Sequence, residues 1–198
     1  MTQHKIAVVV GSLRADSLNR KLAKALCNLS PGTLDCGIVE IGDLPLYDPD
    51  ADGQPPEPWV RFRESIRASE GVLFVSPEYN RSIPGALKNA IDVGSRPYGG
   101  SAWAKKPAGV VTASPGGIGG FGCNHALRQC CVFLDMPVMQ QPEAYFGGIT
   151  DEKFAPDGAI ADEGLRRIAT AFASAFSEWV HTIHAARAML APDSQGAG

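Results

Sequence analysis

Residues 6–19 read I-A-V-V-V-G-S-L-R-A-D-S-L-N, an apolar run that passes into a polar loop. The run 6–10 is continuously apolar, which is typical of a strand covered on both faces of a parallel sheet. From 19 to 27 the apolar residues follow helical spacing through Leu22 and Leu26. The stretch therefore predicts a strand, a loop and a helix, the first unit of an α/β fold.

The loop after this run carries four side-chain hydrogen-bond donors, Ser12, Arg14, Ser17 and Asn19. At the start of a helix, an anion meets free backbone N–H groups and the positive end of the helix dipole. A guanidinium can bind two phosphate oxygens at once. These groups predict a site for a phosphate monoester that needs no magnesium. Alternatively, Ser17 or Asn19 only caps the helix, which leaves Ser12 and Arg14 unexplained.

Two other phosphate-binding loops are excluded at this turn, because it matches neither G-x-x-x-x-G-K-[ST] nor G-x-G-x-x-G. A G-x-G-x-x-G pattern does occur at Gly117, Gly119 and Gly122. It follows a later strand, and no acidic residue closes a further strand about twenty residues on, as ribose recognition requires. We do not interpret it as an NAD motif.

The composition predicts one globular domain over residues 1–190, with the tail A-P-D-S-Q-G-A-G at 191–198 disordered. The net charge is −3 and the basic residues are scattered, so nucleic acid and anionic membranes are not expected partners. No apolar run reaches the roughly 18 residues of a membrane span. The first residues lead directly into a core strand, and we expect a cytoplasmic protein.

The cysteines and histidines predict no metal site. The five cysteines are odd in number and none stands in a C-x-x-C pair, which argues against a disulfide framework and a zinc site. Cys130 and Cys131 lie in an apolar helical stretch, where a buried inert thiol is expected and a redox role is the alternative. The four histidines lack metal-ligand spacing, and His181 and His184 are expected at the surface of a terminal helix.

Strand-like and helical patterns alternate along the chain. The predicted strands are 5–10, 34–41, 71–76, 108–113 and 137–139. The predicted helices are 19–27, 59–68, 83–93, 124–134 and 163–188. This alternation predicts a doubly wound parallel sheet with helices on both faces. Ligands bind such sheets at the carboxyl ends of the strands, so the loops after the first, third and fourth strands are expected to converge.

The connection 43–58 is rich in Pro, Asp and Gly. Asp48, Asp50 and Asp52 alternate in it and suggest a cation site. Alternating aspartates in such a loop are more often solvated, and we expect that here.

The loop after the third predicted strand reads S-P-E-Y-N-R-S-I-P-G over residues 76–85. A proline-led turn with an aromatic ring and an amide can present backbone groups to the edge of a flat heteroaromatic ring. Its residues Pro77, Glu78, Tyr79 and Asn80 are therefore candidate ligand contacts. The second half of the loop is also interpretable as an ordinary helix start.

The loop after the fourth predicted strand, residues 112–122, contains five glycines. Glycine at that density allows the backbone to approach a ligand closely, which makes Ser114, Gly116 and Gly117 candidates. The alternative is a flexible linker, although linkers rarely stand between a core strand and a buried helix.

Three motifs in this order resemble the NADPH-dependent FMN reductase family, the flavodoxin-like quinone and chromate reductases. The family's phosphate loop G-S-x-R-x-x-S-x-N is matched by residues 11–19, its P-E-Y-N flavin loop by 77–80, and its Ser-plus-glycine loop by 114–120. The resemblance covers residues 6–142. It implies a flavodoxin-like three-layer sandwich with a five-stranded parallel sheet in the order 2-1-3-4-5.

The resemblance also implies that FMN binds with its phosphate on the first loop and its ring against the other two. The implied cofactor contacts are Ser12, Arg14, Ser17, Leu18, Asn19, Pro77, Glu78, Tyr79, Asn80, Ser114, Gly116 and Gly117. Tyr79 is expected to border the nicotinamide site. The resemblance further implies homodimers or homotetramers, with Arg128 and Glu143 as cross-subunit partners on the surface of the 124–134 helix.

On this interpretation the protein is an enzyme that transfers hydride from NADPH or NADH to FMN, and electrons onward to quinones or to chromate, azo compounds, ferric complexes or free flavin. The flavin carries the chemistry, so no catalytic residue is assigned. Arg81 and Arg96 are candidates to meet the 2′-phosphate of NADPH, or are solvated surface charges. The alternatives are a flavodoxin-like electron carrier and a non-redox module that binds a phosphate ligand.

Overall fold

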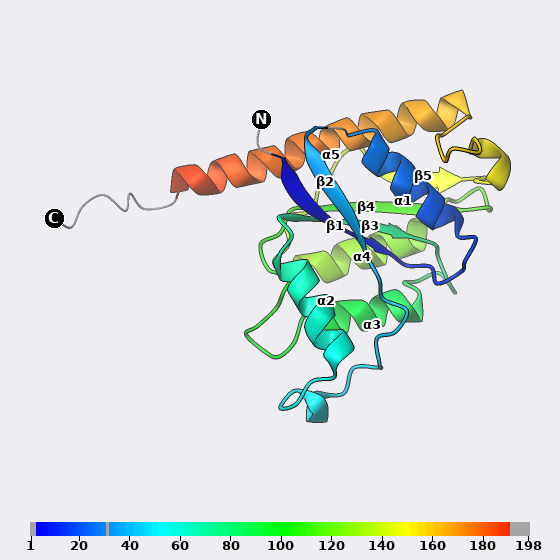
Figure 1. The fold of residues 1–198 in the computed structure, drawn as a ribbon. Coiled ribbons are helices and arrows are strands. Elements are labelled where there is room, and N and C mark those ends of the chain that lie inside the picture. The colour runs from blue at the N-terminus through cyan, green and yellow to red at the C-terminus, as the bar shows by residue number, and fades with distance from the viewer. Residues whose placement is uncertain (1–2, 31, 191–198) are drawn as a thin grey trace.

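A five-stranded parallel sheet in the order β2-β1-β3-β4-β5 forms the centre of the structure (Figure 1). This computed structural model describes residues 3–30 and 32–190, so the tail expected at 191–198 lies outside the described residues. The strands are β1 His4–Val10, β2 Leu34–Val39, β3 Gly71–Ser76, β4 Ala108–Ser114 and β5 Ala144–Gly147. The predicted flavodoxin-like strand order is confirmed.

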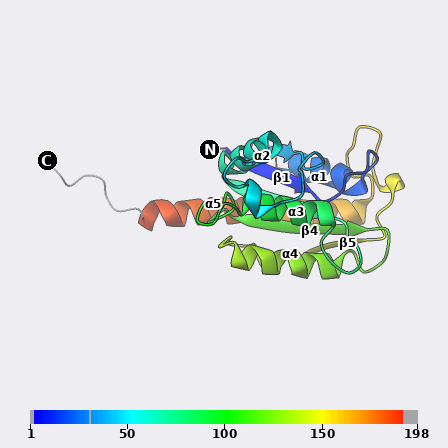
Figure 2. The same cartoon turned by 90° about the horizontal axis from the view of Figure 1, so that it is seen from below.

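Helices cover both faces of the sheet, as the alternating pattern predicts. They are α1 Leu18–Asn28, α2 Glu57–Arg67, α3 Gly85–Gly94, α4 Phe121–Phe133 and α5 Glu163–Leu190. Ile6 and Val8 of β1 pack in one apolar cluster with α1 and α5, and Ala7 and Val9 pack in a second cluster with α2, α3 and α4. This division follows from the alternation of side chains along a strand. The last turns of α5 extend beyond the other elements (Figure 2).

The fifth strand is not where the sequence pattern places it. Residues 137–139 form only an isolated bridge, in which Val138 pairs with Ala108 at the start of β4. The strand β5 begins at Ala144, which pairs with Val111 further along β4. Both segments pair with the same edge of β4. The apolar run 137–139 therefore indicated the correct neighbour, but the strand itself is formed by residues 144–147. Each segment is short, and sequence periodicity resolves such short runs poorly.

Helix boundaries differ from the sequence pattern by a few residues. The third helix was expected from Ile83 and begins at Gly85 instead. Pro84 precedes it, and a proline disfavours helical conformation in the residue before it, here Ile83. In the described residues, no helix combines the length and apolar character that crossing a membrane requires.

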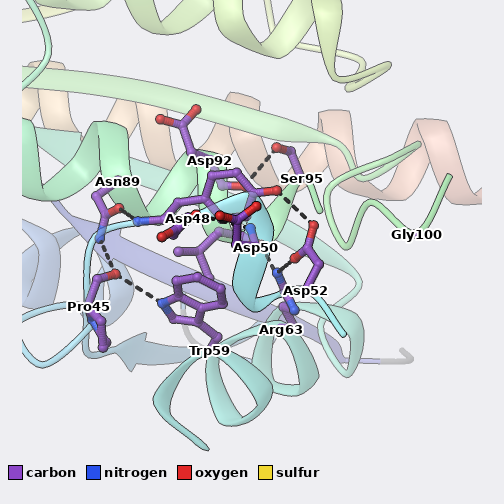
Figure 3. A network of polar contacts seen from close by, with 12 residues as sticks. Pro45, Asp48, Asp50, Asp52, Trp59, Arg63, Asn89, Asp92, Ser95 and Gly100 are labelled. Atoms are coloured by element: carbon purple, nitrogen blue, oxygen red, sulfur yellow. Dashed lines mark hydrogen bonds and ion pairs between the residues drawn. The ribbon is translucent and has the colours of Figure 1, made fainter. Parts of the chain in front are cut away.

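One of the three alternating aspartates, Asp52, is not simply solvated as expected, because it pairs with a buried arginine (Figure 3). Asp48 accepts a hydrogen bond from the backbone N–H of Asp50 and caps a short helical turn at Pro49–Ala51. Asp52 pairs with Arg63 at 3.2 Å. The Arg63 side chain is only 4 % exposed and also donates to the carbonyl of Val93. Arg63 thereby joins the connection to α2 and α3.

Asn89 and Trp59 fasten the start of the same connection (Figure 3). The Asn89 amide donates to the carbonyls of Leu44 and Pro45, and its oxygen accepts from the backbone N–H of Tyr47. The indole of Trp59 donates to the Pro45 carbonyl at 3.0 Å. These contacts anchor the connection on α3, the helix that follows the second candidate loop.

Candidate functional site

The loops after β1, β3 and β4 converge at the carboxyl ends of these strands, as expected for a doubly wound sheet. They enclose a cavity of about 160 Å³. Its lining consists of Ser12, Arg14, Ser17, Leu18, Asn19, Pro77, Glu78, Tyr79, Ala113, Ser114, Pro115 and Ile149. Ile149 adds a fourth segment after β5, so four segments distant in sequence meet at one site.

The first loop presents donors at the N-terminus of α1. The Ser17 hydroxyl accepts a hydrogen bond from the backbone N–H of Arg20 at 3.2 Å, so Ser17 is the helix cap of the alternative interpretation. Its own O–H can still donate into the cavity. Ser12 is buried beside it, whereas Arg14 is exposed and makes no hydrogen bond or ion pair within the described residues. The Arg14 guanidinium is therefore available to a ligand.

Asn19 does not cap the helix. Its amide nitrogen donates to the carbonyl of Ala113 at 3.3 Å, which links the first loop to the end of β4. Its amide oxygen is buried and has no hydrogen-bond partner in the part of the chain that the structure describes. A buried acceptor without a partner is costly. The site therefore favours a ligand that brings a hydroxyl or N–H group to this oxygen.

The second loop is a tight two-residue turn. Tyr79 and Ser82 exchange backbone hydrogen bonds of 3.1 and 2.9 Å. The residues between them, Asn80 and Arg81, have φ values of 51° and 63°. Positive φ at both central positions is typical of a type I′ turn. The turn directs Tyr79, which is 49 % exposed, to the mouth of the cavity.

Glu78 connects the second loop to the N-terminus of α4. Its carboxylate accepts hydrogen bonds of 3.0 Å from the backbone N–H of Cys123 and from the Arg81 guanidinium. Burial alone would raise the pKa of Glu78, but these hydrogen bonds outweigh it, so the pKa lies below its usual value. An ionised carboxylate at this position also interacts favourably with the helix dipole.

Replacing Glu78 with glutamine is expected to lower the free energy of unfolding by about 1 kcal/mol at pH 7, because a neutral amide oxygen is a weaker acceptor. The Glu78 pKa is depressed by folding, so its contribution is present above about pH 4.5 and is lost as the pH falls through the lower folded pKa. Urea unfolding at several pH values should show the difference shrinking in acid. A pH-independent difference would contradict this assignment, and Glu64→Gln at an exposed position of α2 is the control.

Most glycines of the third loop have packing roles rather than ligand roles. Gly119 and Gly120 have positive φ values of 67° and 81°. A Cβ on Gly119 would lie 2.8 Å from the backbone of Tyr145 in β5. Gly116 and Gly117 are exposed and do not line the cavity, and their backbone lies against Gly147 at the end of β5. The glycine density thus reflects close backbone packing more than ligand approach.

Nine of the twelve predicted contacts line the cavity, and Asn80, Gly116 and Gly117 do not. Sequence reasoning missed Ala113, Pro115 and Ile149 as lining residues. The first two belong to the recognised third loop. Ile149 follows β5, so its position became predictable only once the register of β5 was known.

The three thiols of α4 show little nucleophilic character. All five cysteines are free, and Cys131 is buried. Burial raises the pKa of Cys131 to about 12 and that of Cys123 to about 11. A thiol with such a pKa carries little thiolate at neutral pH. Cys130 is half-buried, and burial raises its pKa as well.

A doubly wound sheet of this order, with a phosphate-type loop and two further loops at its carboxyl edge, defines a flavodoxin-like protein. The NADPH-dependent FMN reductase family model matches residues 4–151, and the chain belongs to this family. It is an FMN-dependent oxidoreductase that uses NAD(P)H.

Relatives with known names support this assignment. The chain is 60 % identical over 178 residues to a quinone reductase of Pseudomonas putida KT2440, with 89 % of this chain and 95 % of that protein covered. It is 44 % identical over 176 residues to a 2-hydroxy-1,4-benzoquinone reductase of a Burkholderia species, with coverage of 89 % and 96 %. Among solved structures, FerB, a flavoenzyme NAD(P)H:(acceptor) oxidoreductase from Paracoccus denitrificans, superposes with a TM-score of 0.86 at 42 % identity, covering 90 % of this chain and 98 % of FerB.

Proposed function

We propose that this protein is a quinone reductase, which passes electrons from NAD(P)H through FMN to quinones. The observation that supports this proposal is the position of Tyr79, which is half-exposed at the mouth of the partly enclosed cavity and can contact a flat partner there. The cavity of about 160 Å³ is smaller than the roughly 300–1,000 Å³ of a typical small-molecule pocket, so only part of FMN fits inside. A flavin ring held at this mouth keeps one face open to flat partners. The names of the relatives support a quinone as one such partner.

The residues present fit FMN. We assign the phosphate to the N-terminus of α1, where the Ser12 and Ser17 hydroxyls, the Arg14 guanidinium and backbone N–H groups donate to it. The buried amide oxygen of Asn19 fits a ribityl hydroxyl. When bound, FMN supplies the hydride acceptor and the redox chemistry. The protein's part is to hold the cofactor, while Tyr79 orients flat partners at the mouth.

The second loop and the third loop border the ring in this proposal. Pro77, Glu78 and Tyr79 of the second loop and Ser114 of the third loop line the cavity. Glu78 holds its turn against α4 and acts as a positioning residue. Leu18 contributes apolar surface at the phosphate end. Asn80, Gly116 and Gly117, which lie outside the lining, remain candidates for the exposed edge of the ring.

An anaerobic titration tests this function. FMN-loaded protein should lose its flavin absorbance when NADPH or NADH is added, and a benzoquinone should restore it in a two-electron step. The relative rates with the two donors measure the preference for NADPH. Variants Arg81→Ala and Arg96→Ala test whether either guanidinium meets the 2′-phosphate. Flavin that binds but is not reduced by either donor would favour an electron carrier, and failure to bind flavin would favour a non-redox phosphate module.

The outer face of α4 is proposed as an interface with a second copy of the chain. Phe121, Val132 and Phe133 are 50 %, 75 % and 82 % exposed on this helix. Arg128 on the same helix has a buried guanidinium nitrogen without a partner among the described residues. Glu143 is exposed and near in sequence to β5. The apolar side chains exposed on this helix suit burial against a second copy in a homodimer or homotetramer, with Arg128 and Glu143 proposed as cross-subunit partners at its margin.

Replacing Phe133 with aspartate is expected to shift the protein toward the monomer, because a charge would be buried in an apolar interface. Light scattering coupled to size-exclusion chromatography over a range of concentrations measures this shift. Met189→Asp is the control, since Met189 is 85 % exposed but lies on α5. A wild-type protein that is monomeric at every concentration would contradict the interface.

We propose a cytoplasmic location. The described cysteines are all free, which suits a reducing compartment. The proposed donor NADPH is an intracellular reductant.

A further inference from the structure

Three histidines and one glutamate meet at the amino ends of the strands. The proposed FMN site lies at the opposite end, beside the carboxyl ends of the strands. His4 begins β1, Glu70 precedes β3, and His181 and His184 lie on α5. His4 Nδ1 is 2.8 Å from Glu70 Oε1, and His4 Nε2 is 3.2 Å from His181 Nδ1. The rings of His4 and His184 are stacked with centroids 4.6 Å apart. The expectation of plain surface histidines at 181 and 184 is therefore wrong, since both are half-buried and bonded.

The hydrogen bonds determine which ring nitrogen of His184 is free. Its Nε2 lies 2.8 Å from the backbone carbonyl of Glu70. A carbonyl only accepts, so Nε2 carries the hydrogen and Nδ1 of the neutral ring keeps its lone pair. Histidines that ligate metals usually donate their other N–H to a carbonyl or carboxylate in this way.

His4 is bonded at both ring nitrogens. The Glu70 carboxylate only accepts, so Nδ1 of His4 donates to it, and Nε2 of the neutral ring accepts from the N–H at His181 Nδ1. If Nδ1 of His4 ligates an ion beside Glu70 Oε1, its hydrogen moves to Nε2, and His181 Nδ1 becomes the acceptor. One ligand atom from each of His4, Glu70 and His184 lies within 4.8 Å of the others.

We propose that His4, Glu70 and His184 bind a divalent transition-metal ion of the zinc class. Two imidazoles and a carboxylate are a donor set that suits Zn²⁺ and leaves a fourth position for water. Bond lengths of about 2.0–2.1 Å place tetrahedral ligand atoms roughly 3.3 Å apart. Binding therefore requires one imidazole to turn out of the His4–His184 stack, so that both lone pairs meet at the ion. His181 is a positioning residue, because it acts through the outer nitrogen of His4.

The groups around Glu70 do not compete with a metal ion for its Oε1 oxygen. Its second oxygen accepts from the backbone N–H of Lys5 at 3.0 Å, which fixes its orientation. The nearby Lys106 ammonium bonds the backbone carbonyls of Arg67 and Ser69. Within the described residues, His4 is the only ion-pair partner of Glu70. A bound ion would connect the start of β1 to the C-terminal part of α5 and stabilise both.

The test is calorimetric titration of FMN-loaded, tag-free, chelator-treated protein with Zn²⁺, together with thermal unfolding. We expect one ion per chain and a raised unfolding midpoint. Removing a group that hydrogen-bonds a metal ligand lowers metal affinity by roughly 10–100-fold, and His181→Gln should weaken Zn²⁺ binding within that range. His184→Gln removes a ligand itself and should weaken binding by at least about 100-fold. His125→Gln removes the one remaining histidine and is the matched control.

Absence of stoichiometric Zn²⁺ binding would overturn the proposal, as would an unchanged affinity in His184→Gln. An equal loss in His125→Gln would also overturn it, since that would indicate scattered surface binding. Glu70→Gln serves as a second ligand variant if circular dichroism shows that His184→Gln is misfolded. Because no readout depends on electron transfer, these outcomes are independent of the proposed quinone reductase activity.

Discussion

Replacing Arg14 with alanine is expected to weaken FMN binding by about 10- to 150-fold. A charge-assisted hydrogen bond contributes roughly 1.5–3 kcal/mol, and each 1.4 kcal/mol is a factor of ten in affinity. The Arg14 guanidinium lines the cavity and makes no hydrogen bond or ion pair within the described residues. No internal bond therefore has to break before it meets the phosphate. Quenching of FMN fluorescence on binding to the apoprotein measures the dissociation constant.

Three variants sharpen this experiment. Arg14→Lys keeps the positive charge but cannot bind the phosphate in a bidentate way. Its FMN affinity should therefore lie between those of wild type and Arg14→Ala. Arg20→Ala removes an arginine in the first turn of α1, which pairs with Glu40 and lies outside the cavity, so the FMN affinity of this variant should be nearly unchanged. Tyr79→Ala should reduce turnover more than FMN affinity. An FMN affinity in Arg14→Ala equal to that of wild type would refute the phosphate assignment.

Replacing Arg63 with alanine is expected to lower the free energy of unfolding by about 3 kcal/mol. The change removes the hydrogen bond to the Val93 carbonyl and the ion pair to Asp52. It also removes the guanidinium from its position 5.4 Å from the Trp59 ring centre. Breaking a buried pair from one side costs about 3–5 kcal/mol, and the partial exposure of Asp52, at 22 % of its side chain, places the expected value at the lower end.

Urea unfolding of the FMN-free proteins measures this change without a contribution from cofactor binding. The matched control is Arg61→Ala, two residues earlier on α2, where the arginine pairs with Asp43 at the surface. An exposed pair of this kind contributes about 0–1 kcal/mol. The interpretation fails if the two variants lose similar stability. Asp52→Asn should give an intermediate loss, because it leaves the Arg63 charge buried with its bond to Val93.

The candidate site was predictable where all the groups that bind the ligand lie within one short stretch of sequence. The loop 11–19 carries its donors within nine residues, and a strand–loop–helix unit must place them at a helix N-terminus. The turn 77–82 is similarly local. The assignment of Gly116 and Gly117 to the ligand stays a prediction, because glycine density alone does not distinguish close ligand approach from close backbone packing. The structure shows packing against β5 and Thr112 for the neighbouring Gly119 and Gly120.

The sequence by itself determined the class of fold, the edge of the sheet that binds the ligand, and most of the cavity lining, because these depend on periodicity and on loops of a few residues. Tertiary structure alone decided the register of β5, the burial of Arg63 beside Asp52, and the meeting of His4 and Glu70 with His184. These features join residues far apart in the chain. Such contacts depend on how whole elements pack, which no local pattern records, and the histidine cluster therefore became visible only when α5 was in place against β1.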